Sequence, residues 1–123
     1  MLQIIIQGRG GQGAQTAGNL LAAARPDTLI VVNSAQAPEH FARALPGQRV
    51  VPVDGIGISR RRGLARIVNS ALLGAFARAI EAPDFDVLAR TLAAEVPKLR
   101  DENLAACEDG YARVDALLRR MAA

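Results

Sequence analysis

The pattern of apolar and polar positions divides the chain into two halves. In the first half, residues 2–7, 28–32 and 49–53 form short apolar runs that are rich in isoleucine or valine. Uninterrupted apolar runs of this length are typical of strands that are buried on both faces of a parallel sheet. Residues 14–24 and a short segment that begins at Pro38 have helical patterns between these strands. The first half therefore predicts the order β-α-β-α-β.

The second half has helical periodicity. Residues 64–80 place apolar side chains at helical spacing, and the opposite side of this helix is also mostly small or apolar. A helix that is apolar nearly all round is expected to be buried on two sides. The next helix begins after Asp84 and is expected to turn inward Phe85, Leu88, Leu92 and Val96. The last helix is expected to turn inward Leu104, Cys107, Tyr111, Val114, Leu118 and Met121.

Three details of the helical half carry expectations of their own. Residues 54–63 are rich in glycine and arginine and predict a connecting loop. Gly74 predicts that another helix approaches closely. Asn69, within the apolar helix, needs a hydrogen-bond partner if it is buried, and we interpret it as a structural tie to a neighbouring loop.

Together these elements predict a small three-layer α/β/α domain with a mostly parallel sheet, in the order β-α-β-α-β and then three helices. The 123 residues are enough for one core and few for two, so we expect a single domain over residues 1–123. Half of the residues are apolar, but only 3% are aromatic. Small side chains bury little area each, so the isolated domain should be modestly stable and should benefit from a partner.

Charge and composition narrow the function classes. The formal net charge is +3, and 14 of the 15 basic residues are arginines spread along the chain. Without a basic face or aromatic side chains to stack on bases, nucleic-acid binding is not expected. The first apolar run lacks the features of a signal peptide, and no stretch is long enough to cross a membrane, so we expect a cytoplasmic protein without membrane contact.

Cys107 and His40 could in principle be catalytic residues, but each has a simpler interpretation. Cys107 is the only cysteine, which excludes an internal disulfide and a cysteine-based cluster within the chain. Its helical pattern predicts a buried, inert thiol. His40 is the only histidine, and on a short outer helix it is expected to be a surface residue.

A glycine-rich turn is the main candidate for ligand binding. Gly8, Gly10 and Gly13 match G-x-G-x-x-G between a predicted strand and a predicted helix, where free N–H groups attract phosphate. NAD or FAD is disfavoured, because Asn33 stands where an acidic residue would bind the ribose and because Gln12 would crowd the helix start. Two interpretations of the turn stay open: the glycines allow strand and helix to pack closely, or the turn binds another phosphate or carboxylate. The candidate cofactor-binding residues are Gly8, Arg9, Gly10, Gly11, Gln12 and Gly13.

A wider pattern is more specific than these glycines. Residues 4–13, Ile-Ile-Ile-Gln-Gly-Arg-Gly-Gly-Gln-Gly, followed by an alanine-rich helix, resemble the opening of gamma-type subunits of 2-oxoacid:ferredoxin oxidoreductases, the pyruvate/ketoisovalerate oxidoreductase family. Residues 29–34 are similar to a later strand of that family that ends in asparagine, residues 68–75 to its buried Asn…Leu-Gly-Ala helix, and residues 103–111 to its closing helix. Family members are longer between the first helix and Asn33, so the chain resembles a gamma-type domain that is shortened in the middle.

The resemblance implies an accessory, non-catalytic subunit that is not active alone. In such complexes a 2-oxoacid is decarboxylated, electrons pass to ferredoxin, and the acyl group passes to coenzyme A. Alpha- and beta-type catalytic subunits hold thiamine diphosphate with Mg²⁺, and iron–sulfur clusters lie in those or in a ferredoxin-like subunit. The resemblance implies that this chain binds none of these cofactors alone, packs against the catalytic subunits and helps coenzyme A access. Candidate contacts for coenzyme A are the turn at residues 8–13 and Arg60, Arg61 and Arg62, although a solvated loop also explains the arginines.

Two other functions remain open from the sequence. The missing middle segment favours a stand-alone nucleotide-binding or coenzyme-A-binding module. The helix at residues 64–80, apolar on two sides, favours a structural oligomerisation domain.

Overall fold

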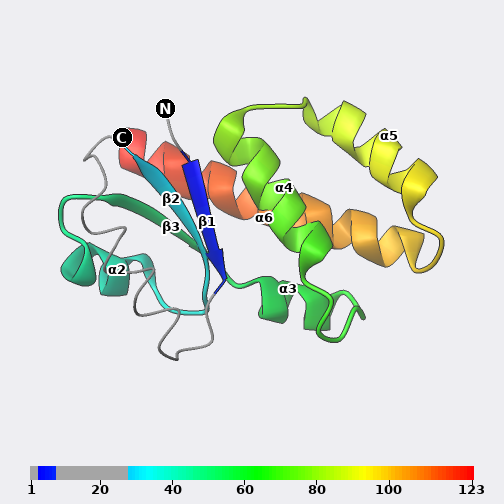
Figure 1. Cartoon of the computed structure of the whole chain (residues 1–123), viewed down its shortest axis with the longest axis horizontal. Coiled ribbons are helices and arrows are strands. Elements are labelled where there is room, and N and C mark those ends of the chain that lie inside the picture. Colours follow the sequence, from blue (N-terminus) through cyan, green and yellow to red (C-terminus); the bar gives the residue numbers. More distant parts are fainter. Residues whose placement is uncertain (1–2, 8–27) are drawn as a thin grey trace.

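Three parallel strands form the central sheet of the computed structural model, which describes residues 3–7 and 28–123 (Figure 1). The strands are β1 (Gln3–Gln7), β2 (Leu29–Asn33) and β3 (Arg49–Val53), in the spatial order β1-β2-β3. They pair in register, so that Gln7 lies opposite Asn33 and Asn33 lies opposite Val53. The parallel sheet expected from the sequence is confirmed.

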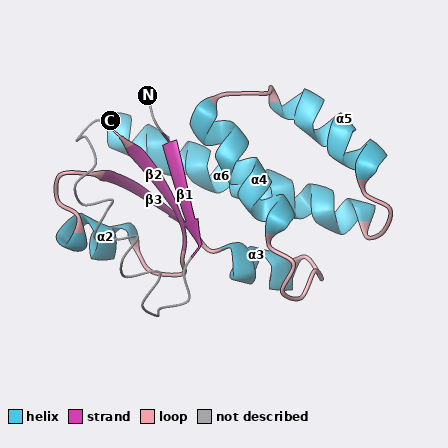
Figure 2. Ribbon diagram, viewed as in Figure 1, coloured by secondary structure: helices cyan, strands magenta, loops and turns pink. Residues whose placement is uncertain are grey.

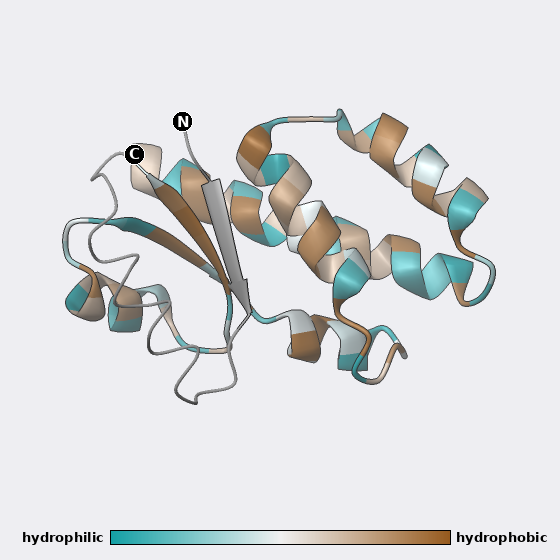
Figure 3. Ribbon diagram, in the orientation of Figure 1, coloured by the Kyte–Doolittle hydropathy of each residue, from teal (hydrophilic) through white to brown (hydrophobic). Residues whose placement is uncertain are grey.

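Helices cover both faces of this sheet and make three layers (Figure 2). On one face, the alternate side chains of Val31 and Val51 pack against helices α4 (Asn69–Ile80) and α6 (Arg100–Ala122). On the other face, Ile30 and Val50 pack against Phe41 of α2 (Pro38–Ala44). Because both faces are covered, the residues between the strand ends of β2 and β3 are apolar (Figure 3). The polar residues Asn33 and Arg49 stand at the ends of these strands.

The loop expected over residues 54–63 is wrong, because this segment contains helix α3 (Gly55–Arg61). Its two glycines are poor helix formers and conceal the helix in the sequence. The structure compensates in two ways: the side chain of Asp54 caps the helix, and Ile58 is buried with only 3% of its surface exposed. Arg60 and Arg61 therefore lie in the last turn of a helix, and Arg62 is its C-cap.

The helix predicted over residues 64–80 begins later than expected, at Asn69. Gly63 and Ala65 have positive φ angles of 79° and 53°, which interrupt the helical conformation before α4 starts. Leu64 is nevertheless buried. The apolar spacing runs through a turn and into the helix, so the periodicity alone overestimates the length of the helix.

Two glycines bring α4 and α6 into close contact. A β-carbon at Gly74 of α4 would overlap the backbone carbonyl of Cys107, and one at Gly110 of α6 would overlap the carbonyl of Ala71. The close approach expected at Gly74 is confirmed, and Gly110 makes the reciprocal contact from the other helix.

The inward face of α6 is partly different from the expected one. Cys107 and Val114 are buried as predicted, but Met121 is 42% exposed. The prediction selected large apolar side chains, whereas the close contact with α4 is made by small ones. The buried positions of α6 are Asn103, Ala106, Cys107, Gly110, Val114 and Leu117.

Helix α5 (Phe85–Glu95) lies outside this pair and packs on α4 and α6 without reaching the sheet (Figure 1). As predicted, Leu88 turns inward and packs between Ala77 and Cys107. The centroids of the Phe85 and Tyr111 rings lie 5.0 Å apart. The helix predicted over residues 14–24 lies outside the described residues. Within residues 3–7 and 28–123, no helix has the length and apolar character needed to cross a bilayer.

Candidate functional site

The three strands end level with one another at the carboxyl edge of the sheet. Their last residues, Gln7, Asn33 and Val53, are register partners across the sheet. In open sheets of parallel strands, ligands bind outside the carboxyl ends of the strands, next to the loops that follow them. The predicted turn, Gly8–Gly13, follows Gln7 in sequence but lies outside the described residues. The described part of this edge consists of the segments that follow β2 and β3.

Asn33 ties the end of β2 to the start of α3. Its side chain is buried, and its Oδ1 accepts a hydrogen bond of 3.0 Å from the backbone N–H of Gly55. A β-carbon at Gly55 would lie 2.9 Å from that oxygen, so only glycine leaves room for the bond. The asparagine that takes the place of a ribose-binding acid thus has a structural role at the strand end.

Asp54 accepts a hydrogen bond from a second N–H group at this helix start. Its Oδ1 accepts a hydrogen bond of 2.9 Å from the N–H of Gly57, and a β-carbon at Gly57 would overlap the carboxylate. Together with Asn33, this carboxylate satisfies two N–H groups that an anionic ligand would otherwise contact. The beginning of α3 is therefore closed by the protein's own side chains.

Two adjoining hollows lie beside these residues and share Ser34, Ala35, Gln36 and Asp54. We name them together the carboxyl-edge cleft. The first hollow has a volume of about 560 Å³ and is completed by Ile58, Arg61, Arg62, Asp109, Ala112 and Arg113. The second has a volume of about 820 Å³ and is completed by Asn33, Ile56, Gly57 and Arg60. Both volumes are in the range of small-molecule sites, and arginine is the prevailing charged residue of their walls.

The three consecutive arginines do not act as one cluster. Arg62 makes a two-pronged contact with Asp109, from Nε to Oδ2 at 2.7 Å and from a terminal nitrogen to Oδ1 at 2.9 Å. This hydrogen bond lowers the pKa of the Asp109 carboxyl below its usual value. Arg60 and Arg61 are exposed in the last turn of α3, and neither has a carboxylate partner within the described part of the chain.

Arg113 was not identified from the sequence as a residue of this site. It projects from α6, and its Nε donates a hydrogen bond of 3.4 Å to the carbonyl of Pro52 in β3. Its guanidinium thus borders the first hollow beside Arg61. The two residues are 52 positions apart, and only the packing of α6 beside β3 brings them together, so no local motif could have indicated the pair.

The other candidate residues have the simpler roles expected of them, with one exception. Cys107 is fully buried, and burial raises the pKa of its thiol to about 11, which makes it unreactive. His40 is exposed on α2. Asn69, considered as a buried tie, is instead exposed at the start of α4. The neighbouring Ser70 is buried and donates to Oδ1 of Asn103.

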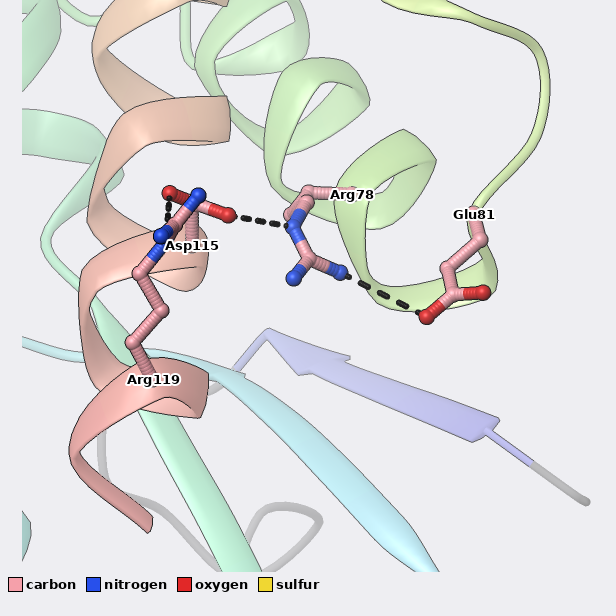
Figure 4. A network of polar contacts seen from close by, with 4 residues as sticks. All are labelled: Arg78, Glu81, Asp115 and Arg119. Atoms are coloured by element: carbon pink, nitrogen blue, oxygen red, sulfur yellow. Dashed lines mark hydrogen bonds and ion pairs between the residues drawn. The ribbon is translucent and has the colours of Figure 1, made fainter. Parts of the chain in front are cut away.

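A second polar cluster joins the last turn of α4 to α6 (Figure 4). Both oxygens of Asp115 accept hydrogen bonds of 2.8 Å, one from Nε of Arg78 and one from Nε of Arg119. These bonds lower the pKa of Asp115. Arg78 also lies 3.8 Å from the carboxylate of Glu81. Since each oxygen of Asp115 already has an arginine partner, the cluster serves to hold the two helices together.

Metal-binding side chains do not gather in the described structure. Within residues 3–7 and 28–123, no three histidine, cysteine, aspartate or glutamate side chains lie close enough together to hold an ion. The carboxyl-edge cleft is thus the candidate site, and its charged walls fit an anionic ligand.

Comparison with known proteins places this fold in a family. Residues 22–113 match the family model described as pyruvate ferredoxin/flavodoxin oxidoreductase. The chain belongs to this family. The resemblance derived from the sequence motifs is therefore confirmed. No curated protein sequence matches the chain.

A solved structure shares the fold of this family member. The chain is similar to the pyruvate oxidoreductase subunit PORC of Thermotoga maritima, with a TM-score of 0.64 and 19% sequence identity. The likeness covers 77% of this chain and 55% of the Thermotoga subunit, so the chain spans about half the length of that relative.

Proposed function

We propose that the chain is an accessory gamma-type subunit of a thiamine-diphosphate-dependent 2-oxoacid:ferredoxin oxidoreductase complex in the cytoplasm, and that residues 1–123 act there as one domain. The observation that carries the proposal is the family match over residues 22–113. The fold shared with a pyruvate oxidoreductase subunit supports it.

In this proposal the chain supplies binding surface and the chemistry belongs to its partners. Alpha- and beta-type subunits would hold thiamine diphosphate and Mg²⁺, and iron–sulfur clusters would lie in those or in a ferredoxin-like subunit. This chain's residues do not fit a cluster, because clusters need several thiolates and the one cysteine is buried in the contact between α4 and α6. The role assigned to the chain is therefore non-catalytic.

We test this role by following activity through a capture experiment. A tagged chain is expressed in its own cells, and an anaerobic extract is passed over the affinity resin. The bound fraction should reduce a viologen dye when both a 2-oxoacid and coenzyme A are supplied, and the flow-through should lose that activity in proportion. Full recovery of the activity in the flow-through would contradict the proposal.

Coenzyme A is the ligand that we assign to the carboxyl-edge cleft. Its diphosphate and 3′-phosphate are anionic, and Arg60, Arg61 and Arg113 line the cleft without a carboxylate partner within the described residues. The predicted turn at residues 8–13 begins one residue after the carboxyl end of β1, at the same edge of the sheet. Both groups of residues identified from the sequence would then serve one ligand.

The same cleft supports the alternative function, a stand-alone nucleotide-binding or coenzyme-A-binding module. Isothermal titration of the purified chain with coenzyme A, ATP and NAD tests the ligand of the cleft, and the capture experiment above separates a subunit from a stand-alone module. For the proposed assignment, coenzyme A should bind and the variant with Arg60→Gln and Arg61→Gln should weaken binding by about tenfold or more, because two charge-assisted bonds are lost. Arg90→Gln on α5, away from the cleft, is the control. Absence of heat with all three ligands would contradict both assignments.

A further inference from the structure

The two outer strands of the sheet have different edges. In β3, the carbonyl of Val53 accepts a hydrogen bond of 2.9 Å from the N–H of Ser34. Because successive residues of a strand face opposite neighbours, the backbone of Pro52 faces the outer edge. Pro52 has no N–H, and its carbonyl accepts from Arg113 at 3.4 Å. Proline and a charged side chain both prevent the addition of another strand, so the β3 edge is protected.

Among the described residues, neither a proline nor a charged side chain protects the outer edge of β1 in this way. Its sequence is Gln-Ile-Ile-Ile-Gln, which contains neither proline nor charge. Among the described residues, no strand pairs with its outer side. An apolar edge with unpaired N–H and C=O groups is a template for another strand.

An exposed apolar stripe of α4 lies next to this edge. Helix α6 packs on β3, whereas α4 packs on β1 and β2, so the side of α4 opposite α6 lies beyond β1 (Figure 1). Leu73 and Ile80 are 40% and 39% exposed there, and the neighbouring Leu72 and Phe76 are half-buried. Their spacing places them on one side of the helix. We name these four residues the α4 stripe.

We propose that the β1 edge and the α4 stripe form the interface with a second copy of this chain, with the two β1 strands antiparallel. The strand sequence is identical in both directions, so pairing about Ile5 sets isoleucine opposite isoleucine and Gln3 opposite Gln7 of the second copy. This is the self-complementarity that a two-fold interface requires. The result is a continuous sheet of twice three strands, whose outer edges are the two protected β3 strands.

Charge supports a second copy as the occupant. A two-fold axis through Ile5 keeps both α4 helices on the same face of the sheet and makes them antiparallel, which opposes their dipoles. The stripe is preceded by Arg66 and followed by Glu81. Arg66 is exposed and has no ion pair among the described residues, and the Glu81 side chain is 81% exposed. The axis brings Arg66 of one copy toward the end of α4 in the other copy, where the exposed carboxylate of Glu81 lies 3.8 Å from Arg78.

A cross-linking experiment tests the register directly. In antiparallel strands, residues that lie directly opposite have β-carbons about 4.5–5.5 Å apart, and a disulfide needs about 3.5–4.5 Å, so a small shift of the strands allows the bond. The variant Ile5→Cys should form a covalent dimer of twice 13.0 kDa under mild oxidation. Gln3→Cys should stay mostly monomeric on a denaturing gel, because its opposite residue is Gln7. Equal cross-linking of the two variants, or none with Ile5→Cys, would overturn the proposed pairing.

Light scattering measures the oligomeric state of the chain without cross-linking, in variants that change the charge at the proposed interface. Gln3→Lys with Gln7→Lys sets like charges opposite each other and should give a monomer. Gln3→Lys with Gln7→Glu sets opposite charges together and should keep the dimer, which separates repulsion from misfolding. Leu73→Glu in the stripe should also dissociate the dimer, whereas Val87→Glu, equally exposed on α5, should not. A wild-type chain that is monomeric at a concentration of about tens of micromolar overturns the proposal. Because the experiment contains no catalytic subunit, its result does not depend on the proposed function.

Discussion

Single atoms decide how closely the helices of this protein pack. At Gly74 and Gly110, the missing β-carbons let the backbones of α4 and α6 touch. The neighbouring pair Ser70 and Asn103 joins the same helices by a buried hydrogen bond. Nδ2 of Asn103 also donates a hydrogen bond of 2.8 Å to the carbonyl of Leu99. Small and polar residues, more than large apolar ones, therefore specify how this pair of helices meets.

Gly74→Ala tests this description of the contact. The new methyl group would meet the carbonyl of Cys107, which is backbone and cannot rotate away, so the helices must separate. We expect a loss of about 1–3 kcal/mol in the free energy of unfolding, measured by urea denaturation. Gly47→Ala is the matched control, because nothing lies within 4 Å of its β-carbon, and it should change stability by less than about 0.5 kcal/mol. A neutral Gly74→Ala would refute the tight contact.

The sequence predicted some of these residues and not others, for a physical reason. Gly74 was recognisable because a glycine within an apolar helix has few roles other than close packing. Asn69 was considered as a buried tie, but α4 starts there, and the neighbouring Ser70 turns inward instead. A helical pattern gives the spacing of buried residues, but the angle of the helix depends on its neighbours.

At the scale of elements, α3 is the piece that organises the candidate site. Its start is fixed by Asn33 and Asp54, and its end is fixed to α6 by Arg62 and Asp109. The sequence located the strand ends and the arginines but could not predict this arrangement. Arg62 and Asp109 are 47 residues apart, and their pairing depends on how α6 crosses the sheet.

The cap at Asp54 should be measurable by itself. Asp54→Ala removes the acceptor of the Gly57 N–H and should lower the free energy of unfolding by about 1 kcal/mol. Asp54→Asn keeps a capping oxygen and should be near neutral, which separates the cap from the charge. Chemical denaturation of the three proteins provides the comparison. Equal losses in the two variants would indicate that the charge, and not the hydrogen bond, is what matters.

The ion pair at the other end of α3 predicts a pH dependence. The pKa of Asp109 is lowered in the folded state, so the ion pair stabilises the fold above the ordinary carboxyl pKa of about 3.9, and this stabilisation is lost as the pH falls through the lower folded value. Asp109→Asn should therefore lower the urea midpoint at pH 7, and the difference from wild type should shrink below about pH 4. Glu95→Gln, exposed at the end of α5 and without an ion pair within the described residues, is the control. A difference that is constant with pH would contradict the ion pair.

At the scale of the whole molecule, the described residues form a small sheet that helices cover on both faces. Apart from α3, which was expected to be a loop, the order of the described strands and helices was predictable, because parallel strands and amphipathic helices have distinct periods. The apolar helix at residues 64–80 raised oligomerisation from the sequence, but the strand edge and the stripe proposed as its interface become visible only when the elements are packed. The carboxyl-edge cleft and the β1 edge lie on different parts of the sheet, so ligand binding and pairing of copies can be tested separately.

The central claim is that this chain works as part of an oxidoreductase complex. Anaerobic affinity purification of the tagged chain from its own cells, followed by quantitative mass spectrometry, tests it most directly. The account predicts that subunits of the thiamine-diphosphate and iron–sulfur type are recovered with the chain in near-equal amounts. Recovery of the chain without any such subunit would contradict the account and would leave only a shared fold and ancestry.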